Sequence, residues 1–229
     1  MSKLVLPTDP AESNAAPPAG LAAWLRKRAI VKGVLLAGLV MFVAEVLRIF
    51  VGANFHVVVP GKCYRSAQPT PEMLKSFQRT HGIRSIVNLR DENEGERWYD
   101  DEKHAADQLG IQLLNAGLST KEQPPDEDFR RFVRAMRDAP EPILIHCANG
   151  NDRTGLASAV YLLMRTPTSL KEARGQLSLR YGHFALGKAL CLHRILDNYE
   201  SWLVENHREH SPAQFAYWGL NVYRQEDPP

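Results

Sequence analysis

Cys147 and Arg153, with five residues between them, are the side chains of this sequence best placed to do chemistry. An apolar run at 142–145 precedes the cysteine, and Thr154-Gly155 and a second apolar run follow the arginine. This pattern predicts a buried strand, a tight loop and a helix. Such a loop directs backbone N–H groups at an anion, and the helix end and the guanidinium both stabilise a thiolate there. The pattern therefore predicts a phosphate-binding loop with a nucleophile at its base.

The predicted chemistry is attack by the Cys147 thiolate on phosphorus, which forms a cysteinyl-phosphate. The guanidinium of Arg153 offers a planar fork to two phosphate oxygens, and Thr154 can donate its hydroxyl to the sulfur when the thiolate leaves. The loop interior contains one acid, Asp152, and no base. Its other members supply the remaining phosphate-binding positions, which are Ala148, Asn149, Gly150 and Asn151.

The segment from His146 to Gly155 resembles the signature of the cysteine-dependent protein tyrosine and dual-specificity phosphatases. A second stretch, Cys63–Pro69 followed by Ile83–Arg90, is similar to the first segment and first core strand of compact bacterial dual-specificity-like phosphatases. The resemblance spans about residues 55–205. It implies a phosphate-monoester hydrolase that acts on phosphorylated proteins and uses no metal or other cofactor. It also implies that His146 orders the loop by hydrogen bonding, and that three further residues line or support the pocket: Arg65, Ser66 and Gln68.

The sequence leaves the general acid open. Tyrosine phosphatases place an aspartate in a mobile loop before the cysteine, but positions 115–121 of this chain contain no acid. The candidates are Asp152, which lies inside the loop as in the myotubularins, and then Glu122 and Asp126. Asp152 ranks first, although an acid at the start of a helix also has a capping role without any catalysis. A chain that lacked the acid would be a weak enzyme or a phosphate-binding module.

Composition limits the other classes of function. The 229 residues suffice for one catalytic domain and an extension, and the net charge of +2 gives no reason to expect binding to nucleic acid. Three cysteines are too few for a disulfide scaffold, and no residue pairs have the spacing of a metal site. Cys63 is expected to be a partly buried strand cysteine rather than a redox partner of Cys147. Because the loop interior carries no base, an inositol phosphate or phosphoinositide is the second choice of substrate, after a phosphoprotein.

Strands that alternate with helices predict an α/β fold, in which helices flank a central, mostly parallel sheet. Ligands of such sheets bind at the carboxyl ends of the strands, where Cys147 lies. The phosphatase domain is expected over 54–208, and 209–229 would form a tail or a short helix. Strands are expected at 55–59, 85–89, 111–114 and 142–147, and helices at 71–81, 96–109, 125–137, 153–164, 169–181 and 188–205.

Residues 1–28 have a basic end at Arg26-Lys27-Arg28 and are expected to be disordered. The apolar stretch 29–51 is long enough to cross a membrane, and its basic flank would keep the N-terminus in the cytoplasm. We therefore expect a single-pass anchor in a bacterial inner membrane, with the phosphatase domain facing the periplasm. A cleaved signal peptide, which would release the domain to the periplasm, and an amphipathic helix are alternatives, because charged residues leave only 33–44 uncharged.

Overall fold

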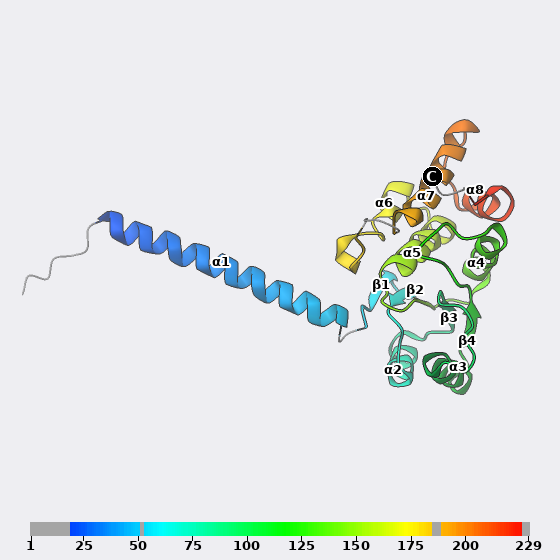
Figure 1. Ribbon diagram of the computed structural model, residues 1–229, viewed down its shortest axis with the longest axis horizontal. Helices are drawn as coiled ribbons and strands as arrows, with labels where there is room; N and C mark the ends of the chain where they lie inside the picture. The colour runs from blue at the N-terminus through cyan, green and yellow to red at the C-terminus, as the bar shows by residue number, and fades with distance from the viewer. Residues whose placement is uncertain (1–18, 51–52, 185–188, 226–229) are drawn as a thin grey trace, which may run out of the picture. The chain divides into compact units, whose positions relative to one another are not determined.

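The computed structural model describes residues 19–50, 53–184 and 189–225, and the side chains of 19–23 and 45–50 lie outside this description. The chain divides into two units, Met1–Val46 and Leu47–Pro229. Residues 19–46 of helix α1 (Ala19–Phe50) make up the described part of the first unit, and the second unit holds the end of α1, the sheet and the other helices (Figure 1). Residues 19–28 are thus helical rather than disordered.

Helix α1 contains the apolar stretch for which a membrane anchor is predicted. Its large apolar side chains are exposed, as at Leu35 (67%) and Met41 (68%). Within the described residues, however, no helix combines the length and the apolarity needed to cross a membrane. The charged residues Arg28 and Lys32 lie in the part of α1 whose side chains the structure describes, and they interrupt its apolar sequence. The predicted anchor at 29–51 is therefore not supported, and the periplasmic location stays a prediction.

The second unit is built on a mixed five-stranded sheet with the strand order β1-β2-β5-β3-β4. Strand β1 pairs antiparallel with β2, whereas the three other pairs are parallel. The α/β fold with a mostly parallel sheet agrees with the prediction, and β5 lies at its centre. The strands are β1 (His56–Val59), β2 (Cys63–Ser66), β3 (Ser85–Asn88), β4 (Gln112–Asn115) and β5 (Ile143–His146).

Helices cover both faces of this sheet (Figure 1). On one face lie α2 (Pro71–His81) and α3 (Arg97–Leu109), which enclose the smaller core. Helix α2 begins after the Thr70 cap and ends at Gly82, as predicted. The larger core lies on the opposite face, under α4 (Asp126–Asp138), α5 (Asp152–Arg165), α6 (Leu170–Arg174), α7 (Leu190–Glu205) and α8 (Pro212–Tyr217).

The helix predicted over 169–181 is broken. Helix α6 has the capping box of Ser169 and Glu172 at its start but ends at Gly175, and a 3₁₀ turn (Leu179–Tyr181) follows. Gln176, in the gap, accepts hydrogen bonds from Arg65 with both its backbone and its side-chain oxygen. The tertiary contact therefore replaces the helical hydrogen bonds that local propensity favours.

The alternation of side chains along β5 sets the geometry of the site. Ile143 and Ile145 belong to the larger core, whereas Leu144 belongs to the smaller one. Because successive residues of a strand point to opposite faces, His146 is directed at α3 and Cys147 at the side of α5. The larger core also includes residues after α7, namely Phe215, Trp218 and Tyr223.

Candidate active site

The loop of residues 147–151 connects the carboxyl end of β5 with the first residue of α5, Asp152. Cys147 is buried, with 3% of its surface exposed, and its Sγ accepts a hydrogen bond from the backbone N–H of Gly150 at 3.3 Å. The start of α5 adds the positive end of a helix dipole at the same place. An amide donor and a helix end together place positive partial charge around the sulfur.

Gly150 is the one loop position where only glycine fits. Its φ angle is +72°, and a Cβ atom there would lie 2.6 Å from the backbone N of Ala67 and 2.7 Å from the carbonyl carbon of Ser66. Both atoms are backbone atoms at the end of β2, which cannot move away as the end of a flexible side chain can. The loop is therefore packed directly against the neighbouring backbone, which holds the Gly150 amide against Sγ.

The loop carbonyls are bound from behind by Arg65 and Asn54. The fully buried Arg65 donates from Nη2 to the carbonyl oxygens of Gly150 (2.9 Å) and Asn151 (3.2 Å). Asn54 donates from Nδ2 to the carbonyl oxygen of Asn149 at 3.2 Å. Because the C=O and N–H of a trans peptide point in opposite directions, these bonds leave the loop amides free to face the inside of the cradle.

Arg65 is in turn held rigidly. Its Nη1 donates to the carbonyl and side-chain oxygens of Gln176, both at 2.9 Å, and its guanidinium lies 4.0 Å from the ring centre of Tyr181. Burial lowers the pKa of Arg65 to about 10. The side chain thus supports the loop, as predicted, rather than facing a ligand.

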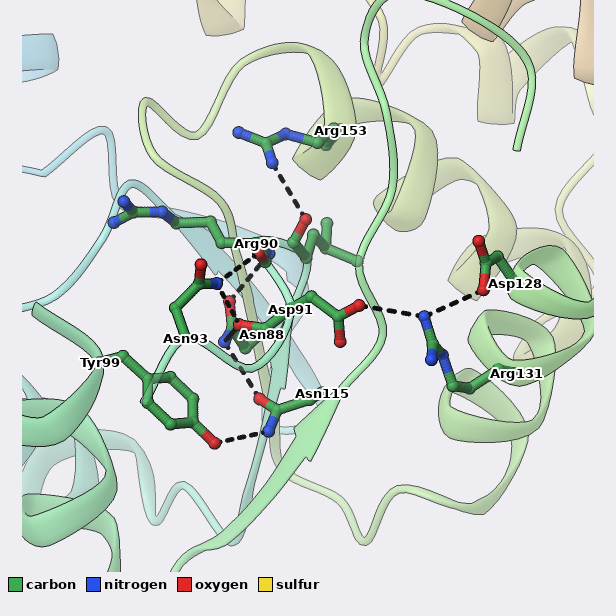
Figure 2. A network of polar contacts seen from close by, with 10 residues as sticks. Asn88, Arg90, Asp91, Asn93, Tyr99, Asn115, Asp128, Arg131 and Arg153 are labelled. Carbon is green, nitrogen blue, oxygen red and sulfur yellow. Dashed lines mark hydrogen bonds and ion pairs between the residues drawn. The ribbon is translucent and has the colours of Figure 1, made fainter. Parts of the chain in front are cut away.

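Arg153 lies at the start of α5, and its Nη1 donates to the carbonyl oxygen of Leu89 at 3.1 Å (Figure 2). Its Nε is buried and has no hydrogen-bond partner among the described residues. A buried guanidinium donor without a partner is costly unless a ligand binds it. An anion in the loop would satisfy this donor.

The bend after β3 that presents the Leu89 carbonyl is fixed by buried amides (Figure 2). Asn88 donates from Nδ2 to the carbonyl oxygen of Asp91 (2.9 Å) and to Oδ1 of Asn115 (3.0 Å), and it accepts from the N–H of Arg90 (2.9 Å). The Asp91 carboxylate points away from this bend and lies 3.1 Å from Arg131. The bend therefore carries Leu89 and Arg90 in a defined position beside the loop.

His146 meets a buried acid on the other side of the sheet. Its Nε2 lies 2.9 Å from Oε1 of Glu102 on α3, and the two side chains are 0% and 1% exposed. The two atoms are in close contact, although their geometry is not that of a hydrogen bond. A contact between two polar side chains buried this deeply is uncommon, and it lies directly behind the residue that precedes the nucleophile. The sequence does not point to Glu102, because its partner His146 lies on β5, 44 residues further along the chain.

The sequence model of the family described as "DSP-PTPase phosphatase fused to NAD+ Kinase" matches residues 59–188, more than half of the chain. This chain belongs to that family. It is a cysteine-dependent phosphatase of the dual-specificity type.

Two curated proteins of Arabidopsis thaliana are similar to this phosphatase. "Inositol diphosphatase DSP4" is 29% identical over 170 residues, which cover 71% of this chain and 78% of the relative. "Inositol diphosphatase DSP3" is 33% identical over 110 residues, which cover 45% of this chain and 50% of the relative. The phosphatase therefore spans about half the length of the second relative.

Among solved structures, the core catalytic domain of the PP-IP phosphatase Siw14 from S. cerevisiae has a similar fold. The TM-score is 0.50, the sequence identity is 22%, and the match covers 67% of this phosphatase and 93% of the yeast domain. At this identity the likeness shows a shared fold.

The three candidate acids of the phosphatase differ in their surroundings. Asp152 directly follows the loop, and its Oδ1 is 2.6 Å from Nδ1 of the buried His183. Asp126 is used in structural contacts: it lies 3.3 Å from Arg130 and 3.5 Å from Arg224, and it accepts from the N–H of Gln225 at 2.7 Å. Glu122 is exposed on the preceding loop. These contacts weaken the case for Asp126. Asp152 stays the first candidate because it directly follows the loop.

The structure also places two further residues named in the sequence analysis, Thr154 and the strand cysteine Cys63. The hydroxyl of Thr154 is buried and has no hydrogen-bond partner among the described residues. Its donation to the departing sulfur of Cys147 stays a prediction. Cys63 is aligned with Ile143, four residues before Cys147, which separates the two cysteines by about 13 Å along the strands. They are too far apart for a disulfide, whose Cα atoms are at most about 7 Å apart.

Proposed function

We propose that the phosphatase hydrolyses phosphate monoesters through a cysteinyl-phosphate intermediate on Cys147. The observation that carries this proposal is the 3.3 Å hydrogen bond from the Gly150 amide to Sγ, inside a loop whose carbonyls are bound from behind. This arrangement stabilises negative charge on the sulfur and on the phosphate oxygens at once.

In the first step, a lone pair of the Cys147 thiolate attacks phosphorus, and the bond from phosphorus to the ester oxygen breaks. The leaving oxygen takes a proton from Asp152. In the second step, water attacks phosphorus and gives a proton back to Asp152, the P–S bond breaks, and the thiolate and inorganic phosphate are released. Arg153 and the loop amides bind the three equatorial oxygens, where charge builds up in both transition states.

Replacement of Cys147 by Ser tests this proposal in the full-length protein. We expect hydrolysis of p-nitrophenyl phosphate without added metal, and loss of that activity in Cys147→Ser, since a serine hydroxyl is not ionised at neutral pH. Mass spectrometry of acid-quenched wild type should detect phosphate on the peptide that contains Cys147. Full turnover by Cys147→Ser would contradict the proposal. A folded wild type that binds phosphate without turnover would instead support a phosphate-binding module.

The substrate class is a choice between two candidates. A phosphorylated protein follows from the resemblance to tyrosine and dual-specificity phosphatases. An inositol phosphate is favoured by the similarity over 71% of the chain to a protein named as an inositol diphosphatase. Turnover of phosphotyrosine peptides compared with that of inositol phosphates decides between them.

A further inference from the structure

Arg90 is a cation beside the loop that lacks a carboxylate partner. Its Nη1 donates to Oε1 of Gln68 at 2.9 Å, and its guanidinium carbon lies 3.3 Å from the ring centre of Trp98. No ion pair joins Arg90 to an acid in the part of the chain that the structure describes, whereas most arginines of α4 to α7 have one. Arg90 is thus held in place by two neutral groups rather than by an acid.

The neighbour of Arg90 on the loop side is a second cation. Arg153 binds the carbonyl oxygen of Leu89, the residue before Arg90, and the two guanidinium groups extend to the same side of the bend (Figure 2). The pKa of Arg90 is lowered, first by burial and then by the positive charge of Arg153. Three groups raise the pKa of Arg90 and so oppose this shift: Glu102, the Cys147 sulfur and the exposed Glu96. Glu102 itself contacts His146.

Arg90 is also coupled to the loop through its partner. The backbone N–H of Gln68 donates to the carbonyl oxygen of Ala148 at 3.2 Å, while the side chain of the same residue holds Arg90. The position of Arg90 relative to the loop is therefore set at two points, by Gln68 and by the Leu89 backbone. Two cations at a fixed spacing, both bound to neutral partners, form a site for a pair of anions.

We propose that Arg90 binds a second phosphate group of the substrate while the loop binds the phosphate that is hydrolysed. The substrate is then a densely phosphorylated small molecule, an inositol polyphosphate. This inference rests on the proposed function and selects between its two substrate classes.

The rigid geometry favours an inositol polyphosphate over a phosphoprotein. Phosphates on adjacent carbons of a ring, or within a diphosphate, have a short and fixed spacing, which suits two guanidiniums that are each held in place next to Leu89. A second phosphate on a flexible peptide would lose more conformational entropy on binding. Arg90 also supplies the positive charge that the loop interior, with one acid and no base, does not provide.

The test compares a substrate that carries one phosphate with one that carries several. kcat/KM is measured for p-nitrophenyl phosphate and for a diphosphoinositol polyphosphate, with full-length wild type, Arg90→Gln and Arg90→Lys. Arg97→Gln is the matched control. The side chain of Arg97 is 94% exposed, and Asp101 is the acid with which it forms an ion pair in the described part of the chain. The readout is kcat/KM for the inositol compound divided by kcat/KM for p-nitrophenyl phosphate. This ratio separates an effect on binding of the second phosphate from an effect on the loop, because both substrates need the loop.

We expect this ratio to fall roughly ten- to a hundredfold in Arg90→Gln, the loss of one charge-assisted contact, and to stay unchanged in Arg97→Gln. Arg90→Lys should recover only part of it, because an ammonium neither stacks on Trp98 as a plane nor offers a fork. An equal loss on both substrates would overturn the proposal, since Arg90 would then only support the loop.

Two other results would also overturn it. An unchanged ratio in Arg90→Gln would show that no second phosphate contacts this side chain. A selective loss on a doubly phosphorylated peptide, with no turnover of the inositol compound, would assign the second anion to a phosphoprotein. Absence of p-nitrophenyl phosphate hydrolysis in the wild type would be a failure of the proposed function itself, and is therefore distinguishable from these results.

Discussion

The carboxylate of Asp152 and the imidazole of His183 lie 2.6 Å apart, from Oδ1 to Nδ1. The other ring nitrogen of His183, Nε2, lies 2.8 Å from Nε2 of His193 on α7. His183 is 2% exposed, whereas the Asp152 side chain is 34% exposed. The proposed acid is therefore held by a buried histidine, and its own carboxylate remains open to a ligand.

Replacing Asp152 by Asn should lower kcat most for substrates with poor leaving groups. A general acid contributes roughly a hundredfold or more when the leaving oxygen needs a proton, and little when it does not. We expect such a loss for phenyl phosphate and a much smaller one for p-nitrophenyl phosphate. Steady-state kinetics with both esters measure the difference. A similar loss on both would assign the acid elsewhere, with Glu122 as the next candidate.

His183 should act by positioning Asp152. In His183→Asn, the amide N–H can replace the donor at Nδ1, so we expect most of the turnover of phenyl phosphate to remain. In His183→Ala, the carboxylate loses its donor, and turnover should fall about tenfold or more. Far-UV circular dichroism controls for folding. If the two variants lose the same activity while both stay folded, the contact between His183 and Asp152 is not what matters.

His193 should make the fold less stable in acid. Its pKa lies below the ordinary value of 6.5, because burial and the neighbouring His183 both disfavour its charged form. The unfolded chain therefore takes up this proton at a higher pH than the folded chain does. The free energy of unfolding should then fall as the pH drops below about 6.5, and be constant with respect to this group above that value.

Urea denaturation at several values between roughly pH 5 and 7 measures this slope. In His193→Gln the slope should be shallower, although His210, whose pKa burial also lowers, will keep a part of it. An identical slope in wild type and His193→Gln would mean that His193 does not contribute.

The parts of the site that could be predicted from the sequence are those made by neighbouring residues. The loop from Cys147 to Arg153 follows from one strand end and one helix start, and the bounds of α2 follow from Thr70 and Gly82. The support of the loop could not be predicted in the same way. Arg65 and Gln176 are 111 residues apart, and Asn54 and Asn149 are 95 apart. Such pairs leave no local periodicity or motif.

The same reason explains the errors in the secondary structure. Residues 169–181 have helix formers on both sides of Gly175, but the helix ends at that glycine, and the contact of Gln176 with Arg65 holds the chain out of the helix there. His183 carries no local signal either, because its partner Asp152 precedes it by 31 residues. Tertiary contacts decide both features.

The buried pair of Glu102 and His146 should be coupled in stability. Removal of one partner leaves the other polar side chain buried without its contact, which costs about 1 to 3 kcal/mol. We expect this loss for Glu102→Ala and for His146→Ala, and a double variant that is less destabilised than the sum of both. Asp101→Ala, an exposed neighbour on α3, should change stability by less than about 0.5 kcal/mol. Additive losses in the double variant would contradict the coupling.

Gly150→Ala should impair both stability and turnover, and Gly82→Ala is its matched control. Both glycines have a positive φ angle, +72° and +66°, so both substitutions carry a backbone cost of about 1 kcal/mol. A Cβ atom at Gly82 would have no other atom within 4 Å, whereas one at Gly150 would lie 2.6 Å from the backbone N of Ala67. The difference between the two variants isolates the packing of the loop against the backbone after β2.

To relieve that overlap the loop must move, which draws the Gly150 amide away from Sγ of Cys147 and its carbonyl away from Arg65. We therefore expect Gly150→Ala to be less stable than Gly82→Ala in urea, and to lose at least about tenfold in kcat/KM for p-nitrophenyl phosphate. Gly82→Ala should keep its activity, because it lies at the end of α2, outside the loop. Equal stability and equal activity of the two variants would show that contact with the backbone after β2 does not set the position of the loop.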